Sequence, residues 1–385
     1  MNRERWAEAR NVLCVRLDSL GDVLLTTPAM AALKHARADR RITLLTSASG
    51  AEAARLVPEI DEVIVYEAPW MKATSNRDAS AADHQMIRRL ACRQFDAAAI
   101  FTVYSQNPLP AALFCYLADI PLRLAHCREN PYQLLTDWVR EPEPQDLVRH
   151  EVQRHLDLVA SVGVEPADDR LRLRVPPMAQ RRVRRLLRTI GLAPSDCWLV
   201  IHPGSTAASR RYPPEQFAKV AEKLAKRGWE VIFTGSEAES KLIAAIQAQM
   251  FMPSRSLAGR LTLGELAALV EASPVLISNN TGPVHVAAAV GTPVVDLYAL
   301  TNPQHTPWRV PHRLLFHDVP CKYCYKSVCP EGHHHCLRRV EPQAVVQATL
   351  ELLQETGRHE RRDITGPENQ CISPRVPFAC GLRGQ

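Results

Sequence analysis

Short apolar runs alternate with segments of helical periodicity along most of the chain. In the first half, five apolar runs predict buried strands, at residues 11–17, 41–46, 62–66, 95–103 and 120–125. Helical periodicity follows each of them, at residues 23–35, 51–56, 84–93, 111–117 and 150–162. Because strands that alternate with helices usually form a parallel sheet covered by helices, this half is predicted to be α/β and doubly wound.

The second half repeats the alternation. Strands are predicted at residues 197–201, 229–234, 275–278 and 292–297, and helices at 179–190, 214–227, 239–250, 262–272 and 342–355. A linker with three prolines, residues 163–177, separates the halves. We therefore expect one domain over residues 1–170 and a second over 178–357. Residues 69–82 predict a mobile loop, and residues 358–385, rich in Arg, Pro and Gly, predict a disordered tail.

Composition narrows the class of protein. The 385 residues are 46% hydrophobic and 23% charged, which is typical of a soluble globular protein. No apolar run approaches the length of a membrane span, and the charged N-terminus does not resemble a signal peptide, so we expect a cytoplasmic protein. The net charge of +6 suits an acidic substrate or an anionic membrane face, and no nucleic-acid-binding motif is present.

Polar and glycine residues follow the predicted strands of the second half. They occur at residues 204–206, 235–237, 280–282 and 301–303. The carboxyl ends of parallel strands share one edge of a sheet, where helix N-termini offer unpaired N–H groups to an anion. Such an edge suits a diphosphate, with Arg210 to neutralise it and Glu237 to bind hydroxyl groups. We interpret it as a nucleotide-sugar site that requires no metal. The corner between the predicted strand at residues 275–278 and the helix that follows contains Asn280, Thr281, Gly282 and His285. For this corner, the alternative to a ligand site is an ordinary helix cap with a packing histidine.

Asp22 lies in a turn between the first strand and the first helix. The turn lacks a G-x-G-x-x-G pattern, so it does not predict a dinucleotide there. The carboxylate either caps the helix or faces the mouth of a cleft.

Taken together, these motifs resemble glycosyltransferase family 9, the ADP-heptose:lipopolysaccharide heptosyltransferases. The resemblance covers residues 11–355. The motifs that match the family are residues 15–22, 202–205, 210–213, 280–285 and 294–307. It implies a GT-B fold, in which two Rossmann-like domains face each other across a cleft and the last helix often returns to the first domain. It also implies inverting transfer of a sugar from a nucleotide-sugar bound by the second domain to an acceptor bound by the first.

The resemblance further implies a role for individual residues. Asp22 would be the general base, and Arg210, at the position of a phosphate-binding lysine, would stabilise the departing ADP. Donor-binding positions would be Ser205, Thr206, Glu237, Asn280, Thr281, Gly282 and His285. The acceptor would be a lipid-linked glycan, with peripheral contact to the inner membrane on its cytoplasmic face.

The sequence departs from the family's motif at Asn280, where the better-studied members of the family have Asp. ADP-heptose is the leading donor, and the alternatives are another nucleotide-sugar or a non-catalytic protein that binds one. On the acceptor side, Arg123, Arg128 and Glu129 are either surface charges or contacts for an acidic acceptor. The five arginines between residues 181 and 188 are either a solvated helix face or a contact for anionic lipid or acidic glycan.

Four cysteines form a separate group near the C-terminus, Cys321, Cys324, Cys329 and Cys336, together with three consecutive histidines at residues 333–335. Thiolates and imidazoles suit tetrahedral zinc, so a structural zinc site is one hypothesis. Free thiols or a redox-sensitive disulfide are the alternatives.

Overall fold

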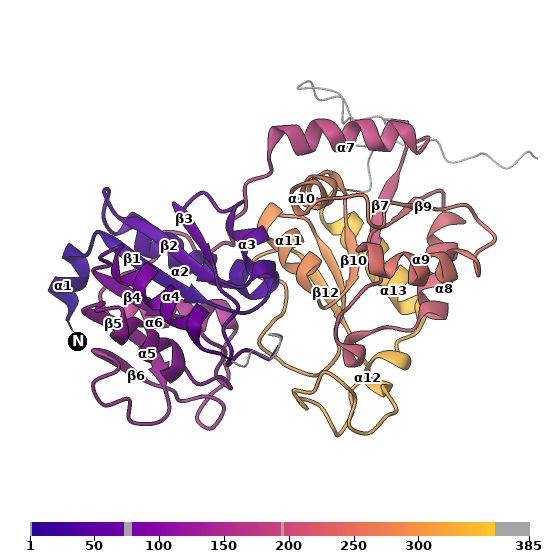
Figure 1. Cartoon of the computed structure of the whole chain (residues 1–385). Helices are drawn as coiled ribbons and strands as arrows, with labels where there is room; N and C mark the ends of the chain where they lie inside the picture. Colours follow the sequence, from indigo (N-terminus) through magenta and orange to yellow (C-terminus); the bar gives the residue numbers. More distant parts are fainter. Residues whose placement is uncertain (1, 73–78, 194–195, 359–385) are drawn as a thin grey trace, which may run out of the picture.

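The computed structural model describes residues 2–72, 79–193 and 196–358 (Figure 1). Each half contains a parallel six-stranded sheet, with strand orders β3-β2-β1-β4-β5-β6 and β12-β11-β10-β7-β8-β9. When each half is numbered from its own first strand, both orders are 3-2-1-4-5-6, the doubly wound Rossmann order. The predicted fold class, two Rossmann-like domains with parallel sheets, is therefore confirmed.

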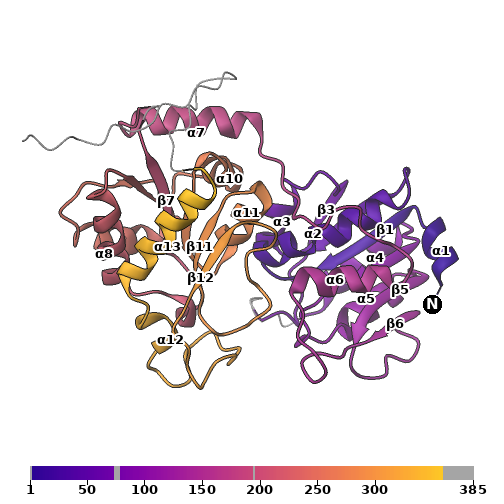
Figure 2. The ribbon, with the colours of Figure 1, turned by 180° about the vertical axis from the view of Figure 1, so that it is seen from behind.

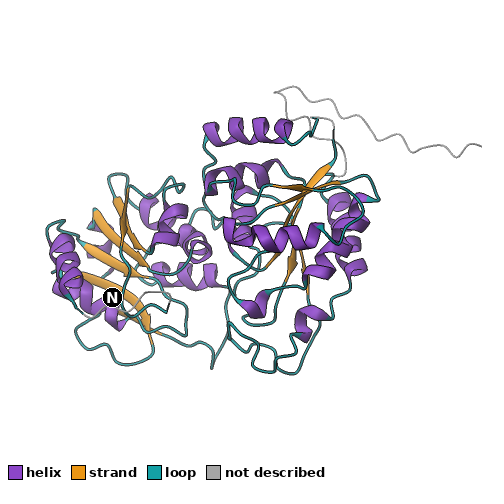
Figure 3. Cartoon of the chain, turned by 45° about the vertical axis from the view of Figure 1, so that its right-hand side comes forward, coloured by secondary structure: helices purple, strands orange, loops and turns teal. Residues whose placement is uncertain are grey.

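The first domain places helices on both faces of its sheet (Figure 3). Its strands are β1 (Asn11–Arg16), β2 (Arg41–Thr46), β3 (Glu62–Val65), β4 (Ala97–Ile100), β5 (Leu122–Cys127) and β6 (Asp137–Arg140). Its helices are α1 (Arg3–Glu8), α2 (Leu20–His35), α3 (Ala48–Ala54), α4 (Ala81–Ala91), α5 (Leu109–Leu117) and α6 (Glu151–Ala160). On β1, Val12 and Cys14 pack in one apolar cluster while Leu13 and Val15 pack in another. Both faces of the strand are therefore buried, which explains its continuous apolar run.

The second domain follows the same plan. Its strands are β7 (Trp198–His202), β8 (Glu230–Phe233), β9 (Arg255–Ser256), β10 (Leu276–Asn279), β11 (Val294–Leu297) and β12 (His312–Leu315). Its helices are α7 (Pro177–Thr189), α8 (Pro214–Ala225), α9 (Ser240–Gln247), α10 (Leu263–Ala272), α11 (Gly282–Val290), α12 (His335–Arg338) and α13 (Pro342–Glu355), with 3-10 turns η1 (Ala208–Arg210) and η2 (Glu237–Glu239). Within the described ranges, no helix combines the length and apolarity needed to cross a membrane.

Several elements differ from the sequence-based expectation. Strands β6, β9 and β12 were not predicted, because they are short edge strands with polar or charged residues. Helix α13 does not return to the first domain: its Val345, Val346 and Leu352 pack with Phe217 of α8 in the core of the second domain (Figure 2). The proposed mobile loop includes residues 73–78 and the proposed tail includes 359–385, all outside the described residues.

The two domains touch where helices α2 and α11 begin. A Cβ atom on Gly21 would lie 2.8 Å from Cδ2 of the His285 ring, and one on Gly282 would lie 2.8 Å from Cδ2 of Leu20. These approaches are shorter than real Cβ contacts allow, so glycine is needed at Gly21, where the neighbour is a buried ring. The N-termini of the two helices are thereby held close together across the domain boundary.

A loop of the second domain, residues 300–309, makes further contacts with the first. The backbone N–H of Glu151 donates to the carbonyl oxygen of Gln304 at 3.1 Å, and the rings of His150 and Trp308 are stacked at 4.4 Å. These contacts join the start of α6 to the loop that follows β11.

Candidate active site

Asp22 belongs to the first turn of α2, because the helix starts at Leu20, three residues earlier than expected. Its Oδ2 atom accepts hydrogen bonds from the Ser19 backbone N–H at 3.1 Å and the Ser19 hydroxyl at 2.6 Å. This arrangement is a capping box, so the structural role considered for Asp22 is real. The side chain is nevertheless 19% exposed, which leaves the carboxylate accessible to a ligand.

Arg16, at the end of β1, is a fully buried cation that binds three carboxylates. Its guanidinium lies 3.2 Å from Asp18, 3.2 Å from Asp22 and 3.4 Å from Glu151. The Glu151 carboxylate in turn lies 2.9 Å from Nε2 of His155. The only sequence signal for Arg16 is a single arginine inside an otherwise apolar run.

This network moves the pKa values of the two aspartates apart. Burial acts to raise the pKa of Asp22, but the charges of Arg16 and His305 and the hydrogen bond from Ser19 outweigh it and lower the pKa to about 2. For Asp18, burial outweighs the attraction of Arg16 and raises the pKa to about 6. Asp22 is therefore ionised at neutral pH, as a general base must be.

The N-terminus of α11 presents the predicted corner. Thr281 is the N-cap residue, Gly282 begins the helix, and His285 lies one turn in. His285 is 5% exposed, and its Nδ1 atom has no hydrogen-bond partner among the described residues. Burial lowers the pKa of His285 to about 3, so the ring is neutral. The positive ends of the α2 and α11 dipoles thus lie near each other, an arrangement that favours an anion between them.

Arg210, the last residue of η1, is a cation that acts on the residues at this corner. It acts electrostatically on His285, Asp296 and His305, and its side chain forms no ion pair within the described part of the chain. His305, on the loop after β11, is 9% exposed and its Nε2 atom has no hydrogen-bond partner among the described side chains. His305 was missed by the sequence analysis, because a histidine between prolines carries no distinctive pattern.

The remaining donor candidates are only partly gathered. Ser205 is buried and donates to the carbonyl oxygen of Ala207 at 3.2 Å, while Thr206 is exposed. Glu237 lies against Gly259, where an added Cβ would be 1.9 Å from Oε2. The carboxylate that lies against Gly204 belongs instead to Glu239, with Oε1 1.9 Å from a Cβ built there. Sequence reasoning missed Glu239.

The acceptor candidates divide into structural and surface residues. Arg123 is buried and donates to the backbone carbonyl groups of Ile120, Gln133 and Leu134, so its interpretation as a surface charge was wrong. Arg128 likewise donates to backbone carbonyl groups, those of Tyr104 and Glu143. Glu129 is exposed and accepts from Asn107 at 2.9 Å.

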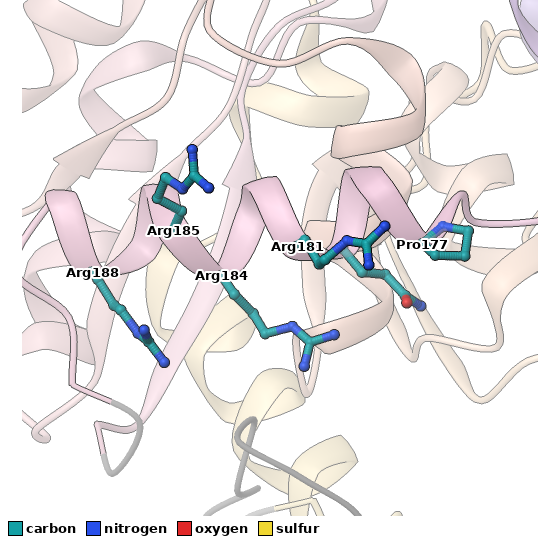
Figure 4. A pocket seen from close by; sticks show the side chains of 6 residues that line it. Pro177, Arg181, Arg184, Arg185 and Arg188 are labelled. Atoms are coloured by element: carbon teal, nitrogen blue, oxygen red, sulfur yellow. The ribbon is translucent and has the colours of Figure 1, made fainter.

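The five arginines of helix α7 are exposed, and four of them are drawn in Figure 4. Arg182 pairs with Glu265 at 2.6 Å. The other four line an open cavity of about 520 Å³: Arg181, Arg184, Arg185 and Arg188. The solvated face that the periodicity predicts is present.

The cysteine group surrounds one small cavity. Cys321, Cys324, Cys329 and Cys336 line about 20 Å³ together with His333 and His334. All four thiols are free, and Cys321 Sγ lies 3.7 Å from Nε2 of His333. No three His, Cys, Asp or Glu side chains in the described ranges are close enough together to hold a metal ion. The residue types and the cavity size suit one ion, whereas the side-chain positions would have to adjust to bind it.

Two Rossmann-like domains that meet where helices α2 and α11 begin are typical of the GT-B fold. Residues 84–335 match the model of glycosyltransferase family 9 (heptosyltransferase), and the chain belongs to this family. Lipopolysaccharide heptosyltransferase 3 of Escherichia coli is 26% identical over 295 residues, covering 75% of this chain and 83% of the relative.

Solved structures have the same fold. A family 9 glycosyl transferase from Veillonella parvula matches with a TM-score of 0.76 and 22% identity, covering 90% of this chain and 98% of the other. The E. coli ADP-heptose lps heptosyltransferase II matches with a TM-score of 0.71 and 22% identity, covering 90% and 99%. The fold is thus shared with these structures, and membership of the family makes the protein a glycosyltransferase.

Proposed function

We propose that the protein transfers a heptose from ADP-heptose to a hydroxyl group of a lipopolysaccharide core or related surface glycan, with inversion and without a catalytic metal. The observation that carries this proposal is the placement of Asp22 and an unpaired Arg210 near two helix N-termini that face each other across the domain boundary. The heptosyltransferase names of the relatives support the substrate class.

Each side of this site has a chemical task in the proposed reaction. Asp22 accepts the proton of the acceptor hydroxyl as that oxygen attacks the anomeric carbon. Arg210 and the N-terminus of α11 stabilise the negative charge that develops on the departing ADP, which is the task a metal performs in other transferases. The further donor contacts that we propose are Ser205, Thr206, Glu237, Asn280, Thr281, Gly282 and His285.

The acceptor is proposed to be lipid-linked, with the enzyme on the cytoplasmic face of the inner membrane. The arginine face of α7 supplies a positive surface for peripheral contact with it. A different nucleotide-sugar donor is the second candidate, favoured by the presence of Asn280 where better-studied members have Asp. An ionised Asp22 at the domain boundary, together with an unpaired Arg210 that acts on His285 at the same boundary, favours catalysis over binding alone.

A donor screen tests the proposal. ADP-heptose, ADP, and UDP- and GDP-sugars are compared by thermal shift, because a ligand of the native state raises apparent stability by mass action. Transfer to heptose-deficient lipopolysaccharide is then measured with each donor that binds, and the anomeric configuration of the product is determined by NMR. Stabilisation by UDP- or GDP-sugars and not by ADP or ADP-heptose would contradict the proposed donor, and a retained configuration would contradict inversion.

The cysteine group is proposed as a structural zinc site, supported by the four thiols and two imidazoles around one cavity. Zinc would be held by four cysteines, or by three cysteines and a histidine, and would stabilise the loop before α12 without taking part in transfer. Metal analysis of protein purified under reducing conditions tests this idea, and protein without stoichiometric metal would rule it out.

A further inference from the structure

The turn η1, which ends at Arg210, is held in place by a loop far along the chain. Ser209, the residue before Arg210, is 3% exposed. Its backbone N–H donates to the carbonyl oxygen of Ser327 at 3.0 Å, and its hydroxyl group donates to the carbonyl oxygen of Lys326 at 2.7 Å. Both donors of Ser209 are therefore bound to one short stretch, which fixes the backbone immediately before the arginine.

This stretch belongs to the loop that contains most of the cysteine group. We call residues 319–334, between β12 and α12, the cysteine loop (Figure 1). Lys326 and Ser327 lie between Cys324 and Cys329, and Ser209 lines the same small cavity as the four thiols. Two consecutive residues of η1 thus have different neighbours: Ser209 lies against the thiols, and the next residue acts on the anion-binding corner. A rearrangement of the thiols would be passed on to the arginine, because closely packed interiors transmit small displacements.

The cysteine loop also supports the loop that follows β11. The backbone N–H of Tyr323 donates to the carbonyl oxygen of Leu300 at 2.6 Å, and that of Tyr325 donates to Thr301 at 2.8 Å. Both tyrosines have a positive φ, 61° and 53°, which is unfavourable for a residue with a side chain and persists only where the surroundings enforce it. The ring of Tyr325 packs edge-on against Tyr104 of the first domain, with centroids 5.7 Å apart. The cysteine loop therefore contacts three parts of the molecule that border the candidate site.

The form of the cysteine loop depends on its cysteines rather than on apolar packing. Every residue from 321 to 334 is at least partly exposed, and those of intermediate burial are three of the cysteines and two of the histidines. Val328, an apolar residue of this stretch, is 68% exposed. Cys321 and Cys336 pack against a small buried cluster that includes Leu300. The thiols are thus the anchor that joins this polar loop to the second domain.

We propose that the cysteine loop positions Arg210 for catalysis, with Ser209 as the positioning residue that connects the two. The inference rests on the proposed function, in which Arg210 stabilises the departing nucleotide. It gives the cysteine group a task beyond local stability: a change at the thiols alters the rate of transfer through η1, although the thiols take no part in the chemistry. The route to the active site is the pair of hydrogen bonds at Ser209.

A double-mutant cycle tests this connection. Ser209→Ala removes the hydrogen bond to Lys326 and is expected to lower kcat about tenfold. In an Arg210→Gln background, the same substitution should change kcat less than about twofold, because the group that Ser209 positions is already absent. Ser209→Thr keeps the hydroxyl group and should stay within about threefold of wild type. Cys324→Ser/Cys329→Ser should repeat the pattern of Ser209→Ala in both backgrounds.

Ser273→Ala is the matched control. Ser273 has no exposed surface, and its hydroxyl group donates to the carbonyl oxygen of Val275 at 2.7 Å, the same length as the bond from Ser209 to Lys326. It lies before β10 begins, at the opposite edge of the sheet from η1, which follows the end of β7. Both alanine variants lose a hydrogen bond of the same kind, so urea unfolding should show similar losses of stability, whereas only Ser209→Ala lowers kcat.

Steady-state turnover is measured with the donor that wild type uses, and calorimetric titration with ADP gives a second readout for the same cycle. Equal costs of Ser209→Ala in the two backgrounds overturn the inference alone, and so does a kcat equal to that of the Ser273→Ala control, because Ser209 is then merely structural. Wild-type protein without transfer activity overturns the proposed function and the inference together. The Ser209 variants decide the result even if Cys324→Ser/Cys329→Ser fails to fold.

Discussion

Replacing Asp22 by asparagine removes the charge and the basicity of the side chain while it keeps the shape. The amide oxygen can still accept from Ser19, so the start of α2 is retained. Arg16 keeps Asp18 and Glu151 as partners. We expect transfer to fall by about 10²- to 10⁴-fold, the usual contribution of a positioned general base.

The cost in stability follows from the pKa of Asp22. A pKa of about 2, against 3.8 for an unperturbed aspartate, corresponds to about 2 kcal/mol of stabilisation by the ionised form. Because the folded-state pKa is lowered, this stabilisation is fully present above about pH 4 and is lost as the pH falls toward about 2. Asp22→Asn should therefore lower the free energy of unfolding by about 2 kcal/mol at pH 7, with a smaller difference in acid.

Three measurements separate these effects: turnover with saturating donor and acceptor, ADP affinity by calorimetry, and urea unfolding at pH 7. ADP affinity should stay within about threefold of wild type, because the proposed base acts on the acceptor hydroxyl and not on the nucleotide. Glu265→Gln is the matched control, since Glu265 closes the capping box of α10 with Thr262, away from the proposed site. Turnover of Asp22→Asn near the wild-type value would refute the assignment of the base.

Three further predictions concern the surroundings of the base. Arg210→Gln should lower kcat by about 10²- to 10³-fold by steady-state assay, with partial recovery in Arg210→Lys, because charge on the departing nucleotide is no longer neutralised; an unchanged kcat would exclude this role. Gly21→Ala should lower both activity and unfolding free energy, the latter by about 1–3 kcal/mol, because its Cβ would meet the His285 ring at 2.8 Å; a stable, active variant would show that the domains yield easily. Asp296→Asn should raise the unfolding free energy by up to about 4 kcal/mol at pH 7 and by little at pH 4, because a folded-state pKa near 8 destabilises the native state between those pH values; equal effects at both pH values would contradict the buried neutral acid.

The main strands could be predicted from the sequence because both of their faces are buried. Strand β2 begins and ends at the expected residues, Arg41 and Thr46. Edge strands such as β12 contain His312 and Arg313 and remain half-buried, so they lack the apolar run on which the prediction depends.

Site residues could be predicted where a polar residue comes shortly after a predicted strand. Asn280 and Asp22 were found in this way. Arg16, His305 and Asp296 were not, because their importance depends on which buried group lies opposite them, and that is decided by tertiary packing rather than by local pattern. Glu239 illustrates the same limit, since only Ala238 separates it from Glu237, yet Glu239 and not Glu237 lies against Gly204.

The contact between the starts of α2 and α11 has a consequence for how such sequences diverge. Gly21 makes room for a ring of the other domain, and Gly282 makes room for Leu20 in return. The leucine side chain can rotate away from a new methyl group, whereas the enclosed imidazole cannot. Among homologues, a larger residue at position 21 should therefore occur only together with a smaller one at position 285, so that two motifs in different domains drift as a single unit.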